Sequence, residues 1–457
     1  MKGINMTTAF FYLGVMLAVI LLWFMVLKRP VYEAILVSFL TLVTVAGKWG
    51  SILKYINEGM STSLLYSMVV FVAMSILLTE TKIIDGAIMI IFALFGRLTG
   101  GAGYVTVIAS SFMGALSGSG PGNVMATGSI TIPAMKRSGF PAELAANVEC
   151  SAACLGNMIP PSSTIVASLG AFTALYPELN VTTGQFWIVC WGCSLWFILL
   201  RLITVFAFCK KYKVKPLKKE EIPTLKETVK TGWQGLMLPL IIFIPFLLDY
   251  LFKESFFTER LGASGAKYLS SSLLYFIAGV ASIYAVIVAK DRKKVKFTAM
   301  AELFGKSVKK FVPTIATCLF GYMFGALYAD INMSEGLEAG IQAMNLGKLG
   351  LCTVVPLLTC ILGMAIIGSS MVVVFGPMFI SLFAAAGVNP LLIAAMLPCI
   401  CGVMSNITPP VAPGFLASMS LAESDYGKTV KNDIWWILGQ YVVEVIVLMG
   451  WLPVLGL

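Results

Sequence analysis

Long uncharged apolar stretches dominate this sequence and restrict where the chain can fold. Several of them, such as residues 9–27, 186–209 and 271–289, are long enough to cross the hydrocarbon core of a bilayer, which needs about 20 apolar residues. Only 12% of the 457 residues are charged, whereas soluble domains carry about 25%. We therefore expect an all-α polytopic membrane protein.

Ten of the apolar runs are predicted to span the membrane. They lie at residues 9–27, 31–46, 61–79, 142–175, 183–209, 233–252, 269–289, 311–330, 390–420 and 433–453. A secretory signal peptide is the alternative for the first run, but Lys28, Arg29 and Pro30 follow it where small residues would mark a cleavage site. We therefore expect the first helix to stay in the protein.

Two further pairs of apolar segments are predicted to form re-entrant helical hairpins. The pairs are 103–117 with 122–135, joined by Gly-Ser-Gly-Pro-Gly at 118–122, and 350–367 with 371–386, joined by Gly-Ser-Ser at 368–370. The members of the first pair are too short to cross the bilayer independently. Each pair is therefore expected to enter and leave the membrane on the same side.

The distribution of basic residues predicts the orientation of the chain. The segments 210–232 and 290–310 are rich in Lys and Arg, so both are expected in the cytoplasm. Counting helices outward from these two anchors puts both termini outside, with Lys48 and Lys54 as exceptions to the charge rule. The same count makes the two hairpins enter from opposite faces of the membrane.

An internal repeat divides the sequence into two similar halves. Shifted by 249 residues, positions 141–161 match positions 390–410 at seven of 21 residues, including both proline pairs. We expect repeats at 1–209 and 233–457, separated by the basic loop 210–232, each with scaffold helices, a hairpin, a broken helix and a final helix. Chance similarity of apolar segments is the alternative, but a twofold Asn-x-x-Pro-Pro motif argues against it. Because the hairpins enter from opposite sides, these are expected to be inverted repeats, which place transporter sites at the midplane.

Paired prolines are expected to break one long helix in each half. Pro160 with Pro161, and Pro409 with Pro410, remove amide donors and open the preceding turn. Irregular backbone at membrane depth is tolerated only where protein or a watery cavity surrounds it. A cation satisfies several freed carbonyls at once, with help from Ser, Thr and Asn oxygens, whereas half-helix amino ends favour an anion. Each broken helix facing its hairpin tip is therefore a predicted sodium site.

The predicted ion ligands come from the hairpin tips and the breaks. The first site would use Ser119, Asn123, Gly156, Asn157 and Ile159, and the second would use Gly368, Ser369, Ser370, Asn406 and Thr408. The candidates for facing the substrate are Gly120, Ser162, Ser369 and Val411. The alternative for each of these side chains is ordinary packing between membrane helices.

Charged residues within apolar segments are further functional candidates, because burying a charge in lipid is costly. Glu149 lies in the first broken helix, and a structural role with Lys136 or Arg137 is its alternative. Arg201 and Glu444 are expected to pair or to snorkel to the interface. The chain contains no His, which removes the commonest general base. An intramembrane enzyme is therefore disfavoured, and so is a channel, because no repeated filter or charge ring is present.

Several motifs resemble the large membrane subunit of the tripartite ATP-independent periplasmic (TRAP) transporters. They are the run from Gly118 to Phe140, Ile159-Pro160-Pro161-Ser162, Gly363-Met364 through Ser370, and Thr408-Pro409-Pro410-Val411, in the family's order and spacing. Asn123, where the dicarboxylate branch usually has Asp, and the Thr-Ile-Pro-x-Met-Lys-Arg-x-Gly string are more similar to the TAXI branch. The hairpin tip Gly120-Pro121-Gly122 is unusually poor in side chains for detailed ion ligands.

This resemblance implies a sodium-driven importer of the elevator type in a bacterial inner membrane. It implies import of a small organic acid, an extracytoplasmic substrate-binding protein, a small four-helix membrane subunit, and no cofactor beyond sodium as coupling ion. TAXI permeases often carry the small subunit on the same chain, and these 457 residues leave no room for it, so a separate subunit is expected. A self-sufficient ion-coupled carrier of organic anions, acting without a binding protein, is the alternative.

Overall fold

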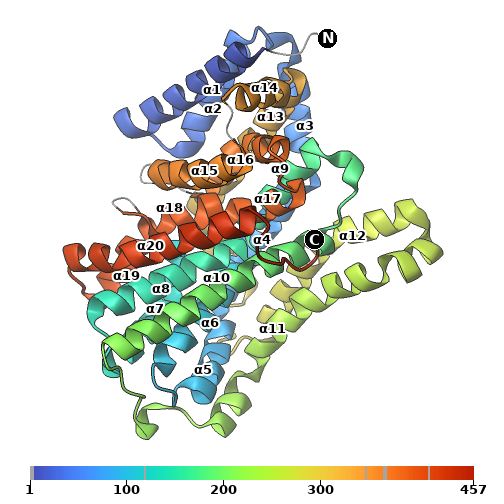
Figure 1. The fold of residues 1–457 in the computed structure, drawn as a ribbon. Helices are drawn as coiled ribbons and strands as arrows, with labels where there is room; N and C mark the ends of the chain where they lie inside the picture. The colour runs from blue at the N-terminus through green and yellow to red at the C-terminus, as the bar shows by residue number, and fades with distance from the viewer. Residues whose placement is uncertain (1–4, 118–119, 345–346, 364–367, 410–411) are drawn as a thin grey trace.

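The computed structural model describes residues 5–117, 120–344, 347–363, 368–409 and 412–457, and its helices are shown in Figure 1. No strand occurs within these ranges. Among the described residues, five helices are long and apolar enough to span a bilayer, or six if the bent pair at 49–61 and 65–81 is one span. The five are Ala142–Leu175, Thr183–Lys211, Leu225–Phe252, Tyr268–Val288 and Pro390–Ile407. The expectation of an all-α polytopic membrane protein is confirmed.

The first half contains ten helices within the described ranges. They are α1 (Met6–Leu21), α2 (Val31–Val45), α3 (Ile52–Ser61), α4 (Ser63–Thr81), α5 (Ile83–Phe95), α6 (Gly101–Ser117), α7 (Gly120–Arg137), α8 (Ala142–Leu155), α9 (Ser163–Leu175) and α10 (Thr183–Lys211). The α6–α7 pair is the first hairpin, and α8 with α9 is the first broken helix. Residues 212–224 then lead into the second half.

The second half repeats the order of hairpin, broken helix and final helix. Its helices are α11 (Leu225–Phe252), α12 (Thr258–Val288), α13 (Phe297–Asp330), α14 (Met333–Met344), α15 (Lys348–Gly363), α16 (Gly368–Ala385), α17 (Pro390–Leu397), α18 (Met404–Ile407), α19 (Pro413–Ala422) and α20 (Tyr426–Leu448). A π-helical segment, Pro398–Val403, connects α17 to α18. Here α15 and α16 form the second hairpin, and α17 to α19 form the second broken helix.

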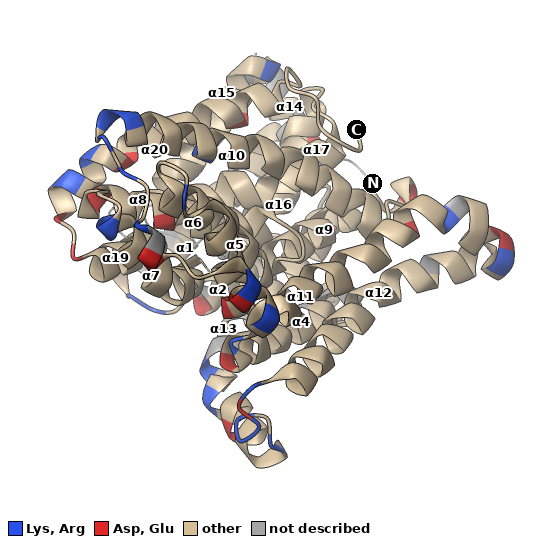
Figure 2. Cartoon of the chain, turned by 90° about the horizontal axis from the view of Figure 1, so that it is seen from below, with Lys and Arg blue, Asp and Glu red and all other residues tan. Residues whose placement is uncertain are grey.

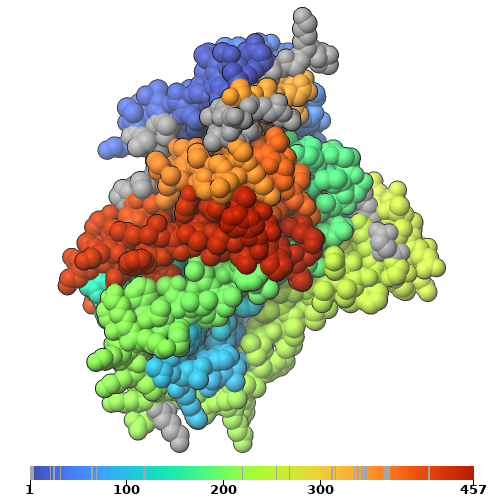
Figure 3. Space-filling model, in the orientation of Figure 1, coloured from blue at the N-terminus to red at the C-terminus, as the bar shows by residue number. Residues whose placement is uncertain are grey.

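The hairpins and broken helices lie in the middle of the molecule. In Figure 1, α1, α2 and α14 lie on one side of this group, and α5, α11 and α12 lie on the other. The two halves interleave, because α19 packs on α7 and α8, and α16 packs on α9. On the face drawn in Figure 3, the orange and red surface of the second half accordingly separates the blue N-terminal helices from green and yellow segments.

Three helices were missed by the sequence analysis, namely α3, α5 and α14. They have only 10, 13 and 12 residues, so none gives the long apolar run that identifies a span. The last helix also differs, since α20 begins at Tyr426 and not at residue 433. Its first two turns carry Lys428, Lys431 and Asp433, which lower the local hydrophobicity.

The second arm of each hairpin begins earlier in the sequence than predicted. Helix α7 already begins at Gly120, and α16 begins at Gly368, so Ser369 and Ser370 belong to its first turn. Pro121 is compatible with this helix start because the first amides of a helix need no intrahelical acceptor. Glycine and proline near a tip therefore do not mark the turn itself.

The two basic exceptions, Lys48 and Lys54, share one acidic partner. Asp330, at the end of α13, accepts from Lys48 Nζ at 2.8 Å and lies 3.7 Å from Lys54 Nζ. Tyr55 donates its hydroxyl to the same carboxylate at 2.7 Å. Elsewhere, the charged residues lie mainly near helix ends and in connections, as Figure 2 shows. Pairing with Asp330 explains how two Lys residues are accommodated outside the basic loops.

Close backbone packing joins the first hairpin to the first break. A Cβ atom added to Gly156 would overlap the backbone of Gly114 in α6, and one added to Gly114 would lie 2.9 Å from the Cα of Gly156. Only glycine at both positions lets the two backbones approach this closely.

Replacing Gly156 with Ala should therefore destabilise the folded protein by about 1–3 kcal/mol, because a methyl group has no room there. Thermal unfolding of the purified protein in detergent measures the effect. Gly279→Ala is the matched control, because a Cβ at Gly279 meets nothing within 4 Å. Equal melting temperatures for the Gly156→Ala variant and the wild type would contradict the close contact.

Candidate functional site

The first break opens the backbone between α8 and α9. A short 3-10 turn at Gly156–Met158 leads to Ile159, which has extended torsion angles (φ −101°, ψ 126°). The carbonyl of Asn157 would be left without an intrahelical donor, but it accepts hydrogen bonds from the hydroxyls of Ser162 and Thr164, both at 2.5 Å. Ser162 also caps α9 by accepting from the amide of Ile165. Its hydroxyl is thus bound inside the break.

The second break has the same position in its half. Thr408 is extended (φ −88°, ψ 112°) and follows α18 directly. Its hydroxyl donates to the Met404 carbonyl at 2.6 Å and lies 3.5 Å from Cys360 Sγ of α15. Asn406 donates its amide to the Gly402 carbonyl at 2.7 Å. Local side-chain donors therefore satisfy carbonyls next to both breaks.

Equivalent contacts hold each hairpin against its own break. Gly114 of α6 touches Gly156, and Gly363 of α15 lies so close to Ser405 that an added Cβ would be 2.7 Å from the Ser405 Cα. These two pairs are related by the same shift of 249 residues that aligns Asn157 with Asn406. The positions that correspond in the sequence thus make corresponding contacts.

The two breaks also lie against each other. The Cβ of Asn157 is 3.8 Å from the place that a Cβ on Gly402 would occupy. From the second break, Asn406 Oδ1 lies 3.4 Å from the place that a Cβ on Gly120, at the start of α7, would occupy. A Cβ on Gly414, near the start of α19, would be 2.8 Å from Cys154 Sγ. The amino ends of α7 and α19 therefore meet around Asn406 and Cys154.

Two buried amide oxygens near the first break have no hydrogen-bond partner among the described residues. Asn123 donates its Nδ2 to the carbonyls of Ser110 (2.6 Å) and Ala153 (3.3 Å), which leaves Oδ1 unpaired. Asn157 Oδ1 is also unpaired and buried. An unpaired buried carbonyl oxygen is costly and calls for an explanation such as a water or an ion. Both of these oxygens belong to residues predicted as ion ligands.

Some of the other predicted site residues lie in the described part of the chain and some lie outside it. Ser119, Pro410 and Val411 lie outside the described residues, and the side chains of Ser369 and Ser370 are outside the described part of α16. Pro160 and Pro161 lie directly after Ile159 and are joined by a cis peptide bond. Pro409 follows Thr408 at the second break. The geometry brings Asn123, Gly156 and Asn157 into one region, and their role as ion ligands stays a prediction.

Glu149 is fully buried in a cage of hydroxyl groups. Thr127 and Thr131 of α7 donate to its two carboxylate oxygens at 2.5 Å each, and Ser110 of α6 donates at 3.0 Å. The alternative partners suggested by the sequence bind elsewhere, since Lys136 donates to the Ala422 carbonyl and Arg137 lies 3.6 Å from Glu221. Glu149 therefore binds both arms of the first hairpin to α8.

The expected snorkelling of Arg201 and Glu444 is wrong. Arg201 is 2% exposed and donates to the carbonyls of Ser151 and Phe197, while Glu444 is fully buried and accepts from Gln440 and Cys399. No ion pair between them occurs among the described residues. The guanidinium therefore binds one backbone carbonyl of α8 and one of its own helix, α10, and does not reach the membrane interface.

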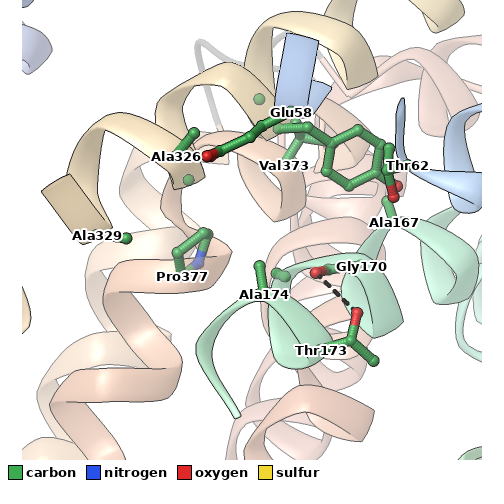
Figure 4. A pocket seen from close by; sticks show the side chains of 14 residues that line it. Glu58, Thr62, Ala167, Gly170, Thr173, Ala174, Ala326, Ala329, Val373 and Pro377 are labelled. Carbon is green, nitrogen blue, oxygen red and sulfur yellow. Dashed lines mark hydrogen bonds between the residues drawn. The ribbon is translucent and has the colours of Figure 1, made fainter. Parts of the chain in front are cut away.

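A cavity of about 320 Å³ lies between the broken helix α9, the hairpin helix α16 and α13. Figure 4 shows Thr173 and Ala174 of α9 on one wall, Pro377 of α16 on another, and Glu58 and Thr62 at the side of α3 and α4. Such a volume fits a small organic solute. Among the described residues, no group of three or more Cys, Asp and Glu side chains is arranged to hold a metal ion.

Several proteins with similar sequences are named as transport permeases. The C4-dicarboxylate TRAP transporter large permease protein DctM of Vibrio cholerae is 25% identical over 406 residues, which cover 84% of each chain. Its namesake from Pseudomonas aeruginosa is 24% identical over 78% of this chain and 77% of the relative. The 2,3-diketo-L-gulonate TRAP transporter large permease protein YiaN of Escherichia coli is 22% identical over 77% of this chain and 76% of its own length.

Solved transporter structures share the fold at low sequence identity. The Alcanivorax borkumensis YdaH transporter superposes with a TM-score of 0.61 at 16% identity, over 89% of this chain and 88% of its own. Neisseria gonorrhoeae MtrF, of a class of antimetabolite efflux pumps, gives a TM-score of 0.63 at 13% identity, over 89% and 86%.

The sequence match that decides the family extends over nearly the whole chain. The model of the tripartite ATP-independent periplasmic transporter DctM component matches residues 9–455. The matched range includes the motifs at the first hairpin and the two breaks, while the assignment to the TAXI branch stays a prediction. This chain is a multi-pass membrane protein and belongs to the DctM family, the large permease subunits of TRAP transporters.

Proposed function

We propose that this permease imports a small organic acid by sodium symport across a bacterial inner membrane. In this proposal, an extracytoplasmic binding protein delivers the solute and a small four-helix subunit assists in the membrane. The relatives named for C4-dicarboxylates and 2,3-diketo-L-gulonate support an organic acid as the solute class.

The observation that carries the sodium proposal is the pair of unpaired amide oxygens, Asn123 Oδ1 and Asn157 Oδ1. Both are buried close to the opened backbone of the first break. A sodium ion binds such neutral oxygens without requiring a carboxylate, and the open backbone of broken membrane helices is a common place for it. The ion is cargo in this scheme, because it crosses the membrane with the solute.

The amino ends of α7 and α19 support an anionic solute. They meet around Asn406 and Cys154, as described above. Helix amino ends carry partial positive charge and unsatisfied N–H groups, which favour a carboxylate. The dipoles of these helices would attract the carboxylate of the solute, so this attraction does not require a basic side chain.

The interleaved arrangement suggests which part moves. We propose that the two halves are inverted repeats and that the group α6–α9 and α15–α19 moves as a transport domain against the remaining helices. The cavity between α9, α16 and α13 lies at the boundary of these two groups. The elevator mechanism expected from the family resemblance would carry solute and sodium together along this boundary.

Uptake into proteoliposomes tests the function directly. We expect accumulation of a dicarboxylate or a sugar acid from a labelled panel only with an inward sodium gradient, the small subunit and the loaded binding protein present together. Uptake by this chain alone with sodium would favour the self-sufficient carrier. Accumulation under a proton gradient without sodium would reject sodium symport.

Asn157→Ala should raise the sodium concentration for half-maximal uptake by about tenfold, since loss of one ion ligand costs on the order of 1.4 kcal/mol in binding. Sodium titration of initial uptake rates measures the change. Asn57→Ala is the control, because Asn57 lies on the exposed face of α3. An unchanged sodium dependence in Asn157→Ala would remove this residue from the site.

Thr408→Ala should likewise raise the sodium concentration for half-maximal uptake. Thr408→Ser should keep this concentration near the wild-type value. Serine retains the hydroxyl that bonds the Met404 carbonyl, and only the methyl group is lost. The same uptake assay separates the two variants. If alanine and serine behave alike, the hydroxyl has no part in ion binding.

A further inference from the structure

Helix α20 carries a buried polar face that the proposed transport cycle does not use. Asp433, Gln440 and Glu444 are 0%, 1% and 0% exposed and lie seven and four residues apart, which places them on one side of the helix. This side packs against α8, α10 and α15. Asp433 meets Asn147 of α8, so a contact between two polar side chains joins the two halves of the chain.

Three buried carboxyl groups in this region have different surroundings. Glu149 accepts from three hydroxyl groups, which suits an ionised carboxylate. Glu444 accepts from Gln440 and Cys399 and interacts electrostatically with Arg201. Asp433 has one donor, Asn147 Nδ2 at 3.1 Å, and takes part in no ion pair among the described residues. Asp433 is thus the least compensated of the three.

The orientation of the Asn147 amide is fixed by its neighbours. Its Nδ2 donates both protons, one to Asp433 Oδ1 and the other to the Thr429 carbonyl at 3.3 Å. The flipped amide would set its oxygen against these two acceptors, which is unfavourable. In the observed orientation, Asn147 Oδ1 and Asp433 Oδ2 are both buried and have no partner among the described residues.

We propose that Asp433 and Asn147 form a buried proton-binding site. When Asp433 Oδ2 binds a proton from the solvent, this atom becomes a hydrogen-bond donor. The unpaired acceptor beside it is Asn147 Oδ1. One proton therefore pairs both orphan atoms and completes a ring of two hydrogen bonds between a carboxylic acid and an amide. Release of the proton leaves a buried carboxylate with one donor, which is costly.

A metal cation satisfies this contact less well than a proton. A sodium ion takes ligands from several oxygens at once, whereas the contact offers two free oxygens, since Thr429 O and Asp433 Oδ1 already accept from Asn147. Other titratable groups face this region from the packed helices. They are Cys150 on α8 and Cys360 on α15, which interact electrostatically with Asp433, and Arg201 on α10 and Cys399 before α18, which interact with Glu444 further along α20.

Infrared difference spectroscopy of the full chain in lipid nanodiscs at neutral pH tests the site. The spectrum of the wild type minus that of the Asp433→Asn variant should contain a carboxylic-acid C=O band that shifts in heavy water. Wild type minus Glu302→Gln is the control and should contain carboxylate bands only, because Glu302 is exposed beside Lys306. A carboxylate band in place of the acid band for Asp433 would overturn the proposal.

Labelling the wild type with carbon-13 at the aspartate carboxyl gives a test that does not depend on folding of the variant. The acid band should shift with the label, and should persist in Asp249→Asn, which removes another buried aspartate. The band should also be the same in sodium and in choline buffer. A band that disappears on adding sodium would mean that the metal ion, not the proton, occupies the contact.

The melting temperature provides a second readout. Asp433→Asn keeps a donor and an acceptor of the same shape, so its melting temperature should be no lower than that of the wild type. Asp433→Leu removes both hydrogen bonds of the acid–amide pair and leaves Asn147 Oδ1 and one Nδ2 proton unpaired, so its melting temperature should fall by several degrees. Equal losses for the two variants would contradict the acid–amide pair.

Discussion

The need to satisfy backbone polar groups inside a bilayer governs this structure. A membrane helix can be opened only where protein or water replaces the lost hydrogen bonds. At the first break, the Asn157 carbonyl receives the hydroxyls of Ser162 and Thr164, and at the second, Thr408 and Asn406 donate to carbonyls of the preceding turn. These local donors stabilise the open backbone while leaving the amide oxygens of Asn123 and Asn157 unpaired.

Close packing around the breaks follows from the same requirement. Lipid must be kept away from the opened turns, so the hairpins lie directly on them, through Gly114 at Gly156 and Gly363 at Ser405. The two breaks also lie against each other at Asn157 and Gly402, and Asn406 of the second break lies beside Gly120 of the first hairpin. A region enclosed in this way excludes lipid yet keeps polar atoms available, which is the physical condition for a transport site at membrane depth.

The buried charged residues show a second solution to the cost of polarity in the membrane. Each is bound by at least one donor or acceptor from another helix, as for Glu149 with the first hairpin and Arg201 with the carbonyl of Ser151. Their bonds connect neighbouring helices, including the final helices α10 and α20, to the hairpins and broken helices. Charge in this protein therefore contributes to holding helices in place as well as to any transport step.

The sequence by itself determined the membrane class, the family and the positions of the two breaks. Apolar length and paired prolines are local properties, so they are readable without coordinates. Short helices such as α5 and the starts of α7 and α16 were not predictable, because their ends depend on packing partners. Only the tertiary structure decided that Asp433 meets Asn147 and that Asn157 lies against Gly402, since these contacts join residues roughly 250 or more positions apart. No local pattern specifies which distant side chain fills the space beside a given residue.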